Sequence, residues 1–224
     1  MRLSLPPSAP GMRIGLYGGS FNPAHLGHRH VSVLAMRRLG LDRVWWLVSP
    51  GNPLKSRKTL PTVAERCAQA HRVARHPRIA VTGVEAALGV RFTVQTLCFL
   101  TRRCPGVHFV WIMGADSLGT FHRWKGSAEI ARLVPIAVID RPGWTMTPLS
   151  ARAAQRLAQA RIPEAAASTL ALRRPPAWTF LHGPRSSLSS TEIRNGMPRR
   201  GGGSETARLQ SPPDTANFMA PREG

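Results

Sequence analysis

Short apolar, β-rich runs alternate along this chain with segments long enough to form helices. The runs cover residues 13–17, 44–48, 108–113 and 136–139, and residues 79–82 and 178–182 are further strand candidates. Alternation of this kind predicts an α/β fold in which a parallel sheet carries helices on both faces. In such a doubly wound sheet, ligands bind outside the carboxyl ends of the strands. The loops after residues 17, 48 and 113 are therefore expected to open on one ligand site.

The first of these loops has the composition of a phosphate site. Residues 18–28 read Gly-Gly-Ser-Phe-Asn-Pro-Ala-His-Leu-Gly-His. Gly18 and Gly19 permit sharp or positive-φ backbone and close approach to a ligand, and Pro23 suits the first turn of a helix. His25 and His28 are three residues apart and share one helix face, beside the free N–H groups of a helix start. We expect two neutral imidazoles that donate hydrogen bonds to phosphate oxygens.

This segment resembles the signature of the HxGH nucleotidyltransferase superfamily, and in its extended form it resembles bacterial nicotinate-nucleotide adenylyltransferases in particular. Four later segments are similar to further motifs of that family. They are Ser49–Lys55, Phe92–Leu97, Trp111–Leu118 with the downstream Phe121 and Trp124, and Ser189–Arg194. The resemblance implies a Rossmann-like fold and transfer of the adenylyl group of ATP to nicotinate mononucleotide. The products would be deamido-NAD, an intermediate of NAD biosynthesis, and pyrophosphate.

The chemistry explains why the motifs contain no paired carboxylates. The attacking phosphate monoester has a second pKa of about 6, so it is already largely dianionic at neutral pH and needs no general base. The difficulty is electrostatic, because two polyanions must meet and further charge develops on the leaving group. Preorganised positive donors must therefore supply the rate.

The resemblance assigns the candidate site residues. It implies a catalytic role for His25, His28, Lys55 and Arg194. It implies ATP binding by Gly18, Gly19, Ser20, Phe21, His25, His28, Gly114, Asp116, Ser189, Ser190, Thr191 and Arg194, and binding of the mononucleotide by Asn22, Lys55, Phe92, Thr93, Trp124 and Lys125. In this assignment Trp124 stacks on the nicotinate ring, and the amides of Thr93 and Lys125 receive its carboxylate. No protein metal site is expected, and Mg²⁺ would arrive with ATP.

Local structure alone offers a second interpretation of two of these segments. Ser189 and Glu192 have the spacing of a capping box, and Asp116 follows a strand where a helix cap is common. Thr62 and Glu65 have the same spacing as Ser189 and Glu192, and there we expect only a cap.

The formal charge of +20 comes from 31 basic and 11 acidic residues. No expected helix carries the clustered basic stripe of a nucleic-acid binder, so we expect no specific nucleic-acid or membrane partner, and homo-oligomer formation stays open. Three cysteines without metal spacing predict buried or free thiols in a reducing cytoplasm. Residues 1–11 are expected to be a flexible extension, 12–197 the nucleotidyltransferase domain and 198–224 a disordered tail.

Two rival functions stand beside this prediction. The same scaffold could adenylylate a different acceptor, such as nicotinamide mononucleotide or phosphopantetheine. Alternatively, a basic nucleic-acid-binding protein could retain the fold without the activity. The Ser-Phe-Asn-Pro form of the first motif argues against the first rival, and the four donors His25, His28, Lys55 and Arg194 argue against the second.

Overall fold

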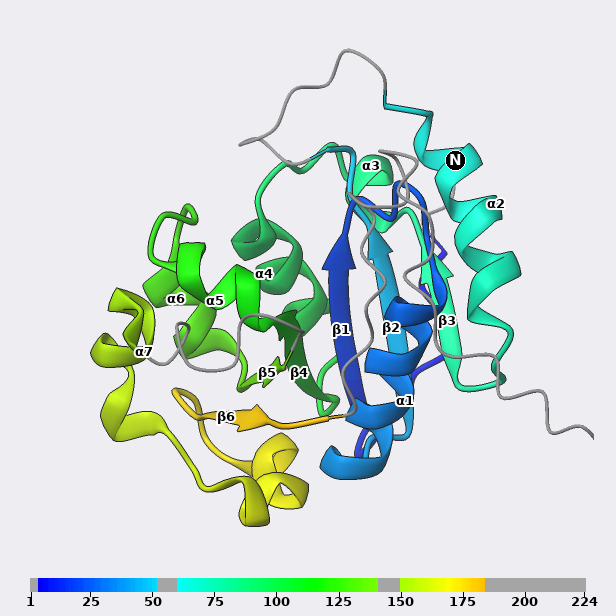
Figure 1. The fold of residues 1–224 in the computed structure, drawn as a ribbon. Helices are drawn as coiled ribbons and strands as arrows, with labels where there is room; N and C mark the ends of the chain where they lie inside the picture. The colour runs from blue at the N-terminus through cyan, green and yellow to red at the C-terminus, as the bar shows by residue number, and fades with distance from the viewer. Residues whose placement is uncertain (1–3, 52–59, 141–149, 184–224) are drawn as a thin grey trace, which may run out of the picture.

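The computed structural model describes residues 4–51, 60–140 and 150–183. Its centre is a six-stranded parallel sheet with the strand order β3-β2-β1-β4-β5-β6 (Figure 1). The strands are β1 (Arg13–Gly19), β2 (Arg43–Val48), β3 (Ile79–Thr82), β4 (His108–Gly114), β5 (Ile136–Ile139) and β6 (Trp178–Leu181). Every neighbouring pair is parallel, which confirms the predicted fold class and all six strand candidates.

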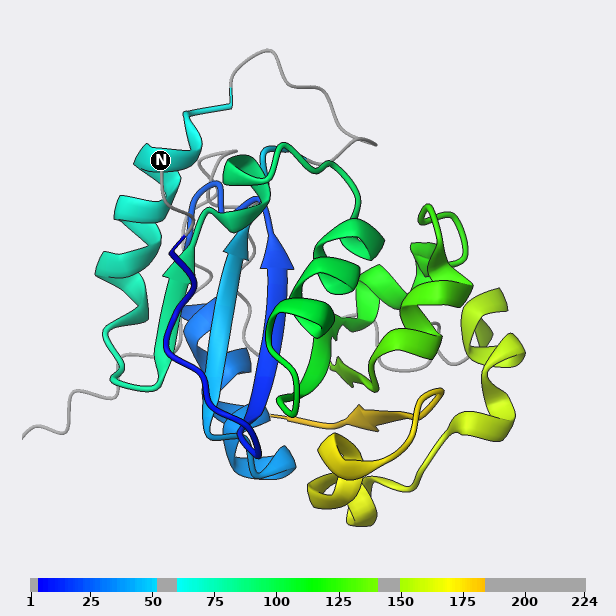
Figure 2. The same ribbon diagram turned by 180° about the vertical axis from the view of Figure 1, so that it is seen from behind.

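Helices cover both faces of the sheet. The core on one face is shared with α1 (Leu26–Leu39), α2 (Val63–Ala74) and the 3₁₀ segment η3 (Glu164–Leu172). The core on the other face is shared with α3 (Val84–Ala87), α4 (Thr93–Arg103), α5 (Ala115–Phe121), α6 (Ser127–Leu133), α7 (Arg152–Arg156) and η2 (Ala158–Ala160). Figures 1 and 2 show α1 and α4 on opposite sides of the central strands. Within the described ranges, no helix has the length and hydropathy needed to cross a membrane.

The central strands β1, β2 and β4 are apolar after their first residue, because both faces of the sheet are buried there. In β2, Trp46 and Val48 point into the core beside α1, whereas Trp45 and Leu47 point into the core beside α4. All four side chains are fully buried. The two tryptophans of β2 are therefore packing residues.

The register of the strands places three loops side by side. Gly18 of β1 pairs with Leu47 of β2, and Tyr17 pairs with Ile112 of β4, so these strands end at the same edge. The chain runs outward from β1 to β2 and β3, and then from β4 to β5 and β6 in the opposite direction. The position between β1 and β4 is therefore the switch point at which α/β sheets bind their ligands.

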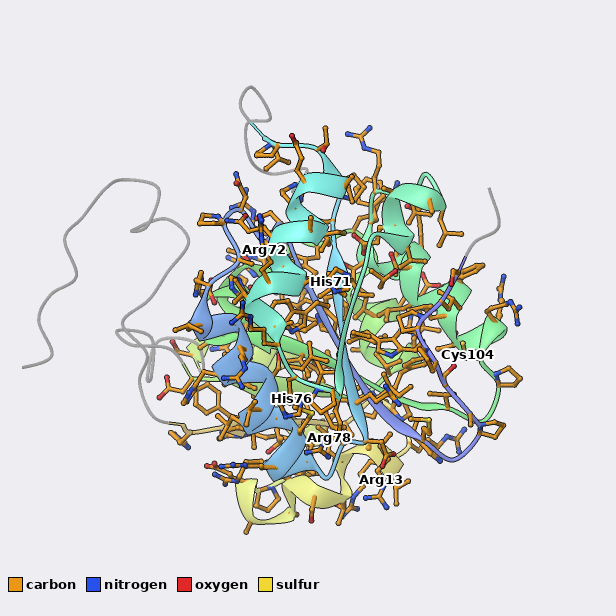
Figure 3. All side chains as sticks on the ribbon, turned by 90° about the vertical axis from the view of Figure 1, so that its right-hand side faces the viewer. Arg13, His71, Arg72, His76, Arg78 and Cys104 are labelled. Atoms are coloured by element: carbon orange, nitrogen blue, oxygen red, sulfur yellow. The ribbon has the colours of Figure 1, made fainter. Side chains whose placement is uncertain are left out.

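Two further segments pack against the core. In the N-terminal extension, Leu5 packs against the core beside α4, and the Ser8 hydroxyl lies 3.8 Å from the sulfur of Cys104, which Figure 3 labels. Residues 162–178 contain η3, where Leu170 is fully buried.

The cysteines behave as predicted. Cys67, Cys98 and Cys104 are all free and half-buried.

Figure 3 shows the carboxyl end of α2, with Arg72 and His71 on the helix and His76 and Arg78 in the turn that leads to β3.

Candidate active site

The first turn of α1 fixes the two histidines of the first motif. The helix begins at Leu26, and His25 is its extended N-cap residue, with φ −148° and ψ 167°. The prediction that Pro23 lies in the first turn is therefore wrong, because the helix starts three residues later. The side chain of His25 takes over the capping role, since its Nδ1 accepts the Gly27 N–H at 3.2 Å.

The backbone also orients the second ring. The N–H of His25 donates to Nδ1 of His28 at 3.2 Å, and the ring centroids lie 3.9 Å apart. Both rings are largely buried, with exposed fractions of 7% and 8%. Because each Nδ1 accepts a hydrogen bond, the proton of each neutral ring is on Nε2. The arrangement fits the predicted pair of neutral N–H donors at a helix N-terminus.

The ring of Phe21 packs between His28 and Trp46. Its ring stacks on Trp46 at 5.0 Å with an interplanar angle of 17°, and its centroid lies 4.8 Å from that of His28. Only 1% of Phe21 is exposed, so its side chain is not available to a ligand. Phe21 can therefore contact ATP only through its backbone.

The two glycines of the motif do not adopt the positive φ that glycine permits. Gly18 and Gly19 are the last residues of β1, and neither has a positive φ; in this loop the positive value, 46°, belongs to Phe21. A Cβ on Gly18 would lie 2.4 Å from Cη2 of Trp111, which is itself buried. Gly18 is thus required by close packing of the strand against Trp111, and of the two conformations that the sequence allowed there, the positive φ is absent.

Four of the six residues predicted to bind the mononucleotide, Phe92, Thr93, Trp124 and Lys125, lie in two segments that meet at the start of α4. The Trp124 ring packs edge-on against Trp111 at 6.3 Å and against Phe121 at 5.5 Å. The next residue, Lys125, places its Nζ 4.6 Å from the centroid of the Phe92 ring. Phe92 is the N-cap residue of α4 and Thr93 is its first residue, so both predicted segments meet at this helix start.

Two side chains that the sequence did not single out hold this helix start. The Gln95 side chain accepts the N–H groups of Arg91 and Phe92, both at 3.2 Å. The buried carboxyl of Glu85, in α3, accepts the Thr96 hydroxyl at 2.9 Å. Burial raises the pKa of Glu85 to about 7, although the hydrogen bond from Thr96 opposes the change. An acidic residue alone inside the apolar run 84–88 is the sequence signal that could have found it.

Gly114 and Asp116 lie at the carboxyl end of β4, at the switch point of the sheet. Gly114 ends the strand and is the N-cap residue of α5. Asp116 lies one residue inside the helix and is half-buried, so it is not the N-cap residue that local structure alone suggested. A carboxylate in a first helical turn is favoured by the helix dipole.

Several predicted residues lie outside the part of the chain that the structure describes. They are Lys55, Ser189, Ser190, Thr191 and Arg194. Thr62 and Glu65, in contrast, form the expected capping box at the start of α2. Among the described residues, no group of three or more His, Cys, Asp or Glu side chains is placed to hold a metal ion.

Comparison with known proteins decides the family. Residues 16–196 match the family model described as cytidylyltransferase-like. A protein of Methylorubrum extorquens named probable nicotinate-nucleotide adenylyltransferase is 68% identical over 183 residues, covering 82% of this chain and 99% of the relative. A protein of Rhizobium johnstonii with the same name is 57% identical over 192 residues, covering 86% and 96%. The chain belongs to the nicotinate-nucleotide adenylyltransferase family of cytidylyltransferase-like proteins.

Solved structures share the fold. The nicotinic acid mononucleotide adenylyltransferase of Plasmodium falciparum, complexed with APC, matches with a TM-score of 0.60 and 17% identity, over 82% of this chain and 83% of that chain. The same protein complexed with NaAD matches with a TM-score of 0.59. At this level of identity the likeness concerns the fold, and it agrees with the six-stranded sheet described above.

Proposed function

We propose that this chain transfers the adenylyl group of ATP to nicotinate mononucleotide, giving deamido-NAD and pyrophosphate. Its family membership supports this reaction, and the observation that carries it in the structure is the buried His25–His28 pair. Both rings are held by backbone N–H groups at a helix N-terminus that lies at the switch point of the sheet. Such a site is suited to bind an anion.

In the reaction, a phosphate oxygen of the mononucleotide attacks the α-phosphorus of ATP. The bond from that phosphorus to the oxygen bridging the α- and β-phosphates breaks, and pyrophosphate leaves with the electron pair. The Nε2–H groups of His25 and His28 would donate to the phosphate oxygens on which negative charge develops. Donors already in position when the charge develops lower the barrier without reorganisation.

Other parts of the proposed site complete the binding of ATP. Lys55 and Arg194 would add positive charge, and Ser189, Ser190 and Thr191 would bind the terminal phosphates through amides or hydroxyls. The amides at Gly18–Ser20 would bind the α-phosphate, and Asp116 would accept ribose hydroxyls. Mg²⁺ enters as part of the ATP substrate, bound through phosphates and water.

The acceptor would bind where Trp124 and the start of α4 meet. Trp124 is half-buried and would offer its ring to the nicotinate for stacking. Thr93 is the first residue of α4, and N–H groups in a first turn have no partner within their helix. The Thr93 amide, with that of Lys125, would bind the ring carboxylate. The Lys125 side chain beside Phe92 adds positive charge to the same place.

Identification of the product tests this proposal. The wild-type protein and His28→Ala are incubated with ATP, Mg²⁺ and nicotinate mononucleotide, and the mixture is separated and analysed by mass spectrometry. We expect deamido-NAD and pyrophosphate in equal amounts from the wild type and much less from the variant. Absence of deamido-NAD with the folded wild-type protein would overturn the proposal.

A further inference from the structure

Arg66 is a buried cation that neither the motifs nor the proposed reaction uses. It lies in the first part of α2, and 1% of it is exposed. The buried residues of this helix are Arg66, Ala70 and Ala74, spaced four apart. Arg66 is therefore the first residue of a buried row whose other members are alanines. Among the described residues, no carboxylate forms an ion pair with it. Burial lowers the pKa of its guanidinium.

The guanidinium is held by backbone carbonyl groups of three separate segments. Its Nη1 donates to the carbonyl oxygen of Ser20 at 2.6 Å and to that of Ser49 at 2.7 Å. Its Nε donates to the carbonyl oxygen of Pro61 at 2.9 Å. One side chain thus joins the loop after β1, the loop after β2 and the residue that precedes the capping box of α2. The N–H of Ser49 also donates to the Gly19 carbonyl at 2.9 Å.

The bond to Ser20 fixes one peptide of the first motif. The Ser20–Phe21 peptide is trans, so the N–H of Phe21 points away from the carbonyl that Arg66 holds. Phe21 has a φ of 46°, a conformation that is unfavourable for a bulky side chain and persists only where the surroundings impose it. The stacking of Phe21 on Trp46 holds one side of this residue, and Arg66 holds the peptide on the other side.

We propose that Arg66 is a positioning residue for ATP, which sets the orientation of the Ser20–Phe21 peptide and thereby the shape of the first phosphate-binding loop. The inference rests on the proposed function, since it assigns ATP to this loop. Arg66 itself does not touch the substrate, because it is buried beneath the loops. Its planar guanidinium presents N–H groups in fixed directions, so one side chain can donate to three carbonyl oxygens. A lysine ammonium is a compact point charge and lacks this planar arrangement of donors.

The test compares Arg66→Lys and Arg66→Met with Arg29→Lys in the full chain. Arg29 is a matched control, because its Nε also donates to a backbone carbonyl, that of Ala74 at 3.1 Å, at the opposite end of α2. Binding of a non-hydrolysable ATP analogue is measured by calorimetry, and amide hydrogen exchange of peptides covering residues 18–24 is measured by mass spectrometry. The melting temperature and kcat/KM are measured on the same samples.

We expect Arg66→Lys to weaken binding of the analogue about tenfold or more, because charge-assisted hydrogen bonds to the loop are lost. Exchange in residues 18–24 should quicken, while exchange in the later turns of α1 stays at the wild-type rate. Arg29→Lys should leave both measurements unchanged. This local effect is one that a general loss of stability does not produce.

Wild-type binding and exchange in Arg66→Lys would overturn the inference. So would quickened exchange throughout the sheet, or failure of both Arg66 variants to fold, because each result assigns the residue to stability alone. Analogue binding and exchange need no acceptor nucleotide. A wild-type protein that binds the analogue but makes no deamido-NAD would therefore refute the proposed function and leave this inference intact.

Discussion

As the pH rises, the free energy of unfolding of Glu85→Gln should increase relative to that of the wild type. The carboxyl of Glu85 is buried in α3, and its described hydrogen bond comes from the Thr96 hydroxyl. Burial raises its pKa from 4.5 to about 7. The folded protein therefore binds this proton more tightly than the unfolded chain does, and stability falls as the pH rises from about 4.5 to 7.

The size of the effect follows from the two pKa values. The difference between 4.5 and about 7, at about 1.4 kcal/mol for each pH unit, corresponds to about 3 kcal/mol. Below about pH 4.5 the wild-type carboxyl is neutral in both states, and this cost is absent. Above about pH 7 the cost is fully present. Glutamine keeps an oxygen that can accept from Thr96 and carries no charge at any pH.

Urea unfolding of the wild type and Glu85→Gln between about pH 4 and pH 8.5 measures this difference. The free energy of unfolding of the variant should gain on that of the wild type by about 3 kcal/mol across the range. Thr96→Val is the companion variant, since losing its hydrogen bond should raise the pKa of Glu85 further and move the transition to higher pH. A difference between Glu85→Gln and the wild type that does not change with pH would refute the reasoning.

Three further substitutions test the site. His28→Ala should lower kcat by about a hundredfold or more with an unchanged melting temperature, because it removes a fixed donor to developing charge; steady-state kinetics at saturating substrate check this. Gly18→Ala should cost about 1–3 kcal/mol in urea unfolding, because its Cβ would lie 2.4 Å from Trp111, and unchanged stability would contradict the packing argument. Trp124→Ala should lower kcat/KM for nicotinate and nicotinamide mononucleotide alike, and a changed ratio between them would show that the ring sets specificity.

The fold could be predicted because its signals are local. Apart from the first residue of β1, β2 and β4, the runs that became β1, β2, β4 and β5 are apolar, as is typical of strands buried on both faces. The capping box of Thr62 and Glu65 was predicted from spacing alone and is present. The start of α1 was placed too early, because Pro23 is a common first-turn residue whereas the imidazole of His25 is an unusual cap.

The frame of the site depends on contacts between distant segments, which no local pattern records. The requirement for glycine at position 18 comes from Trp111, on another strand, and the burial of Leu170 comes from the face of α1 and the sheet. The Arg66 guanidinium donates hydrogen bonds to carbonyl groups that lie 17 and 46 residues away in the sequence. Its position in a buried stripe with Ala70 and Ala74 was the available signal, but periodicity shows only that a side chain is buried and not what it binds.

The preference between acid and amide acceptors tests the central claim most directly. Steady-state kcat/KM is measured by a coupled assay for pyrophosphate release, with nicotinate and nicotinamide mononucleotide side by side at saturating ATP and Mg²⁺. Amide N–H groups directed at the ring substituent favour a carboxylate, because the NH₂ of the amide cannot accept their hydrogen bonds. We predict a preference for nicotinate mononucleotide of about a hundredfold or more, or about 2.7 kcal/mol. Equal efficiency with both acceptors, or no pyrophosphate release with either, would contradict the account.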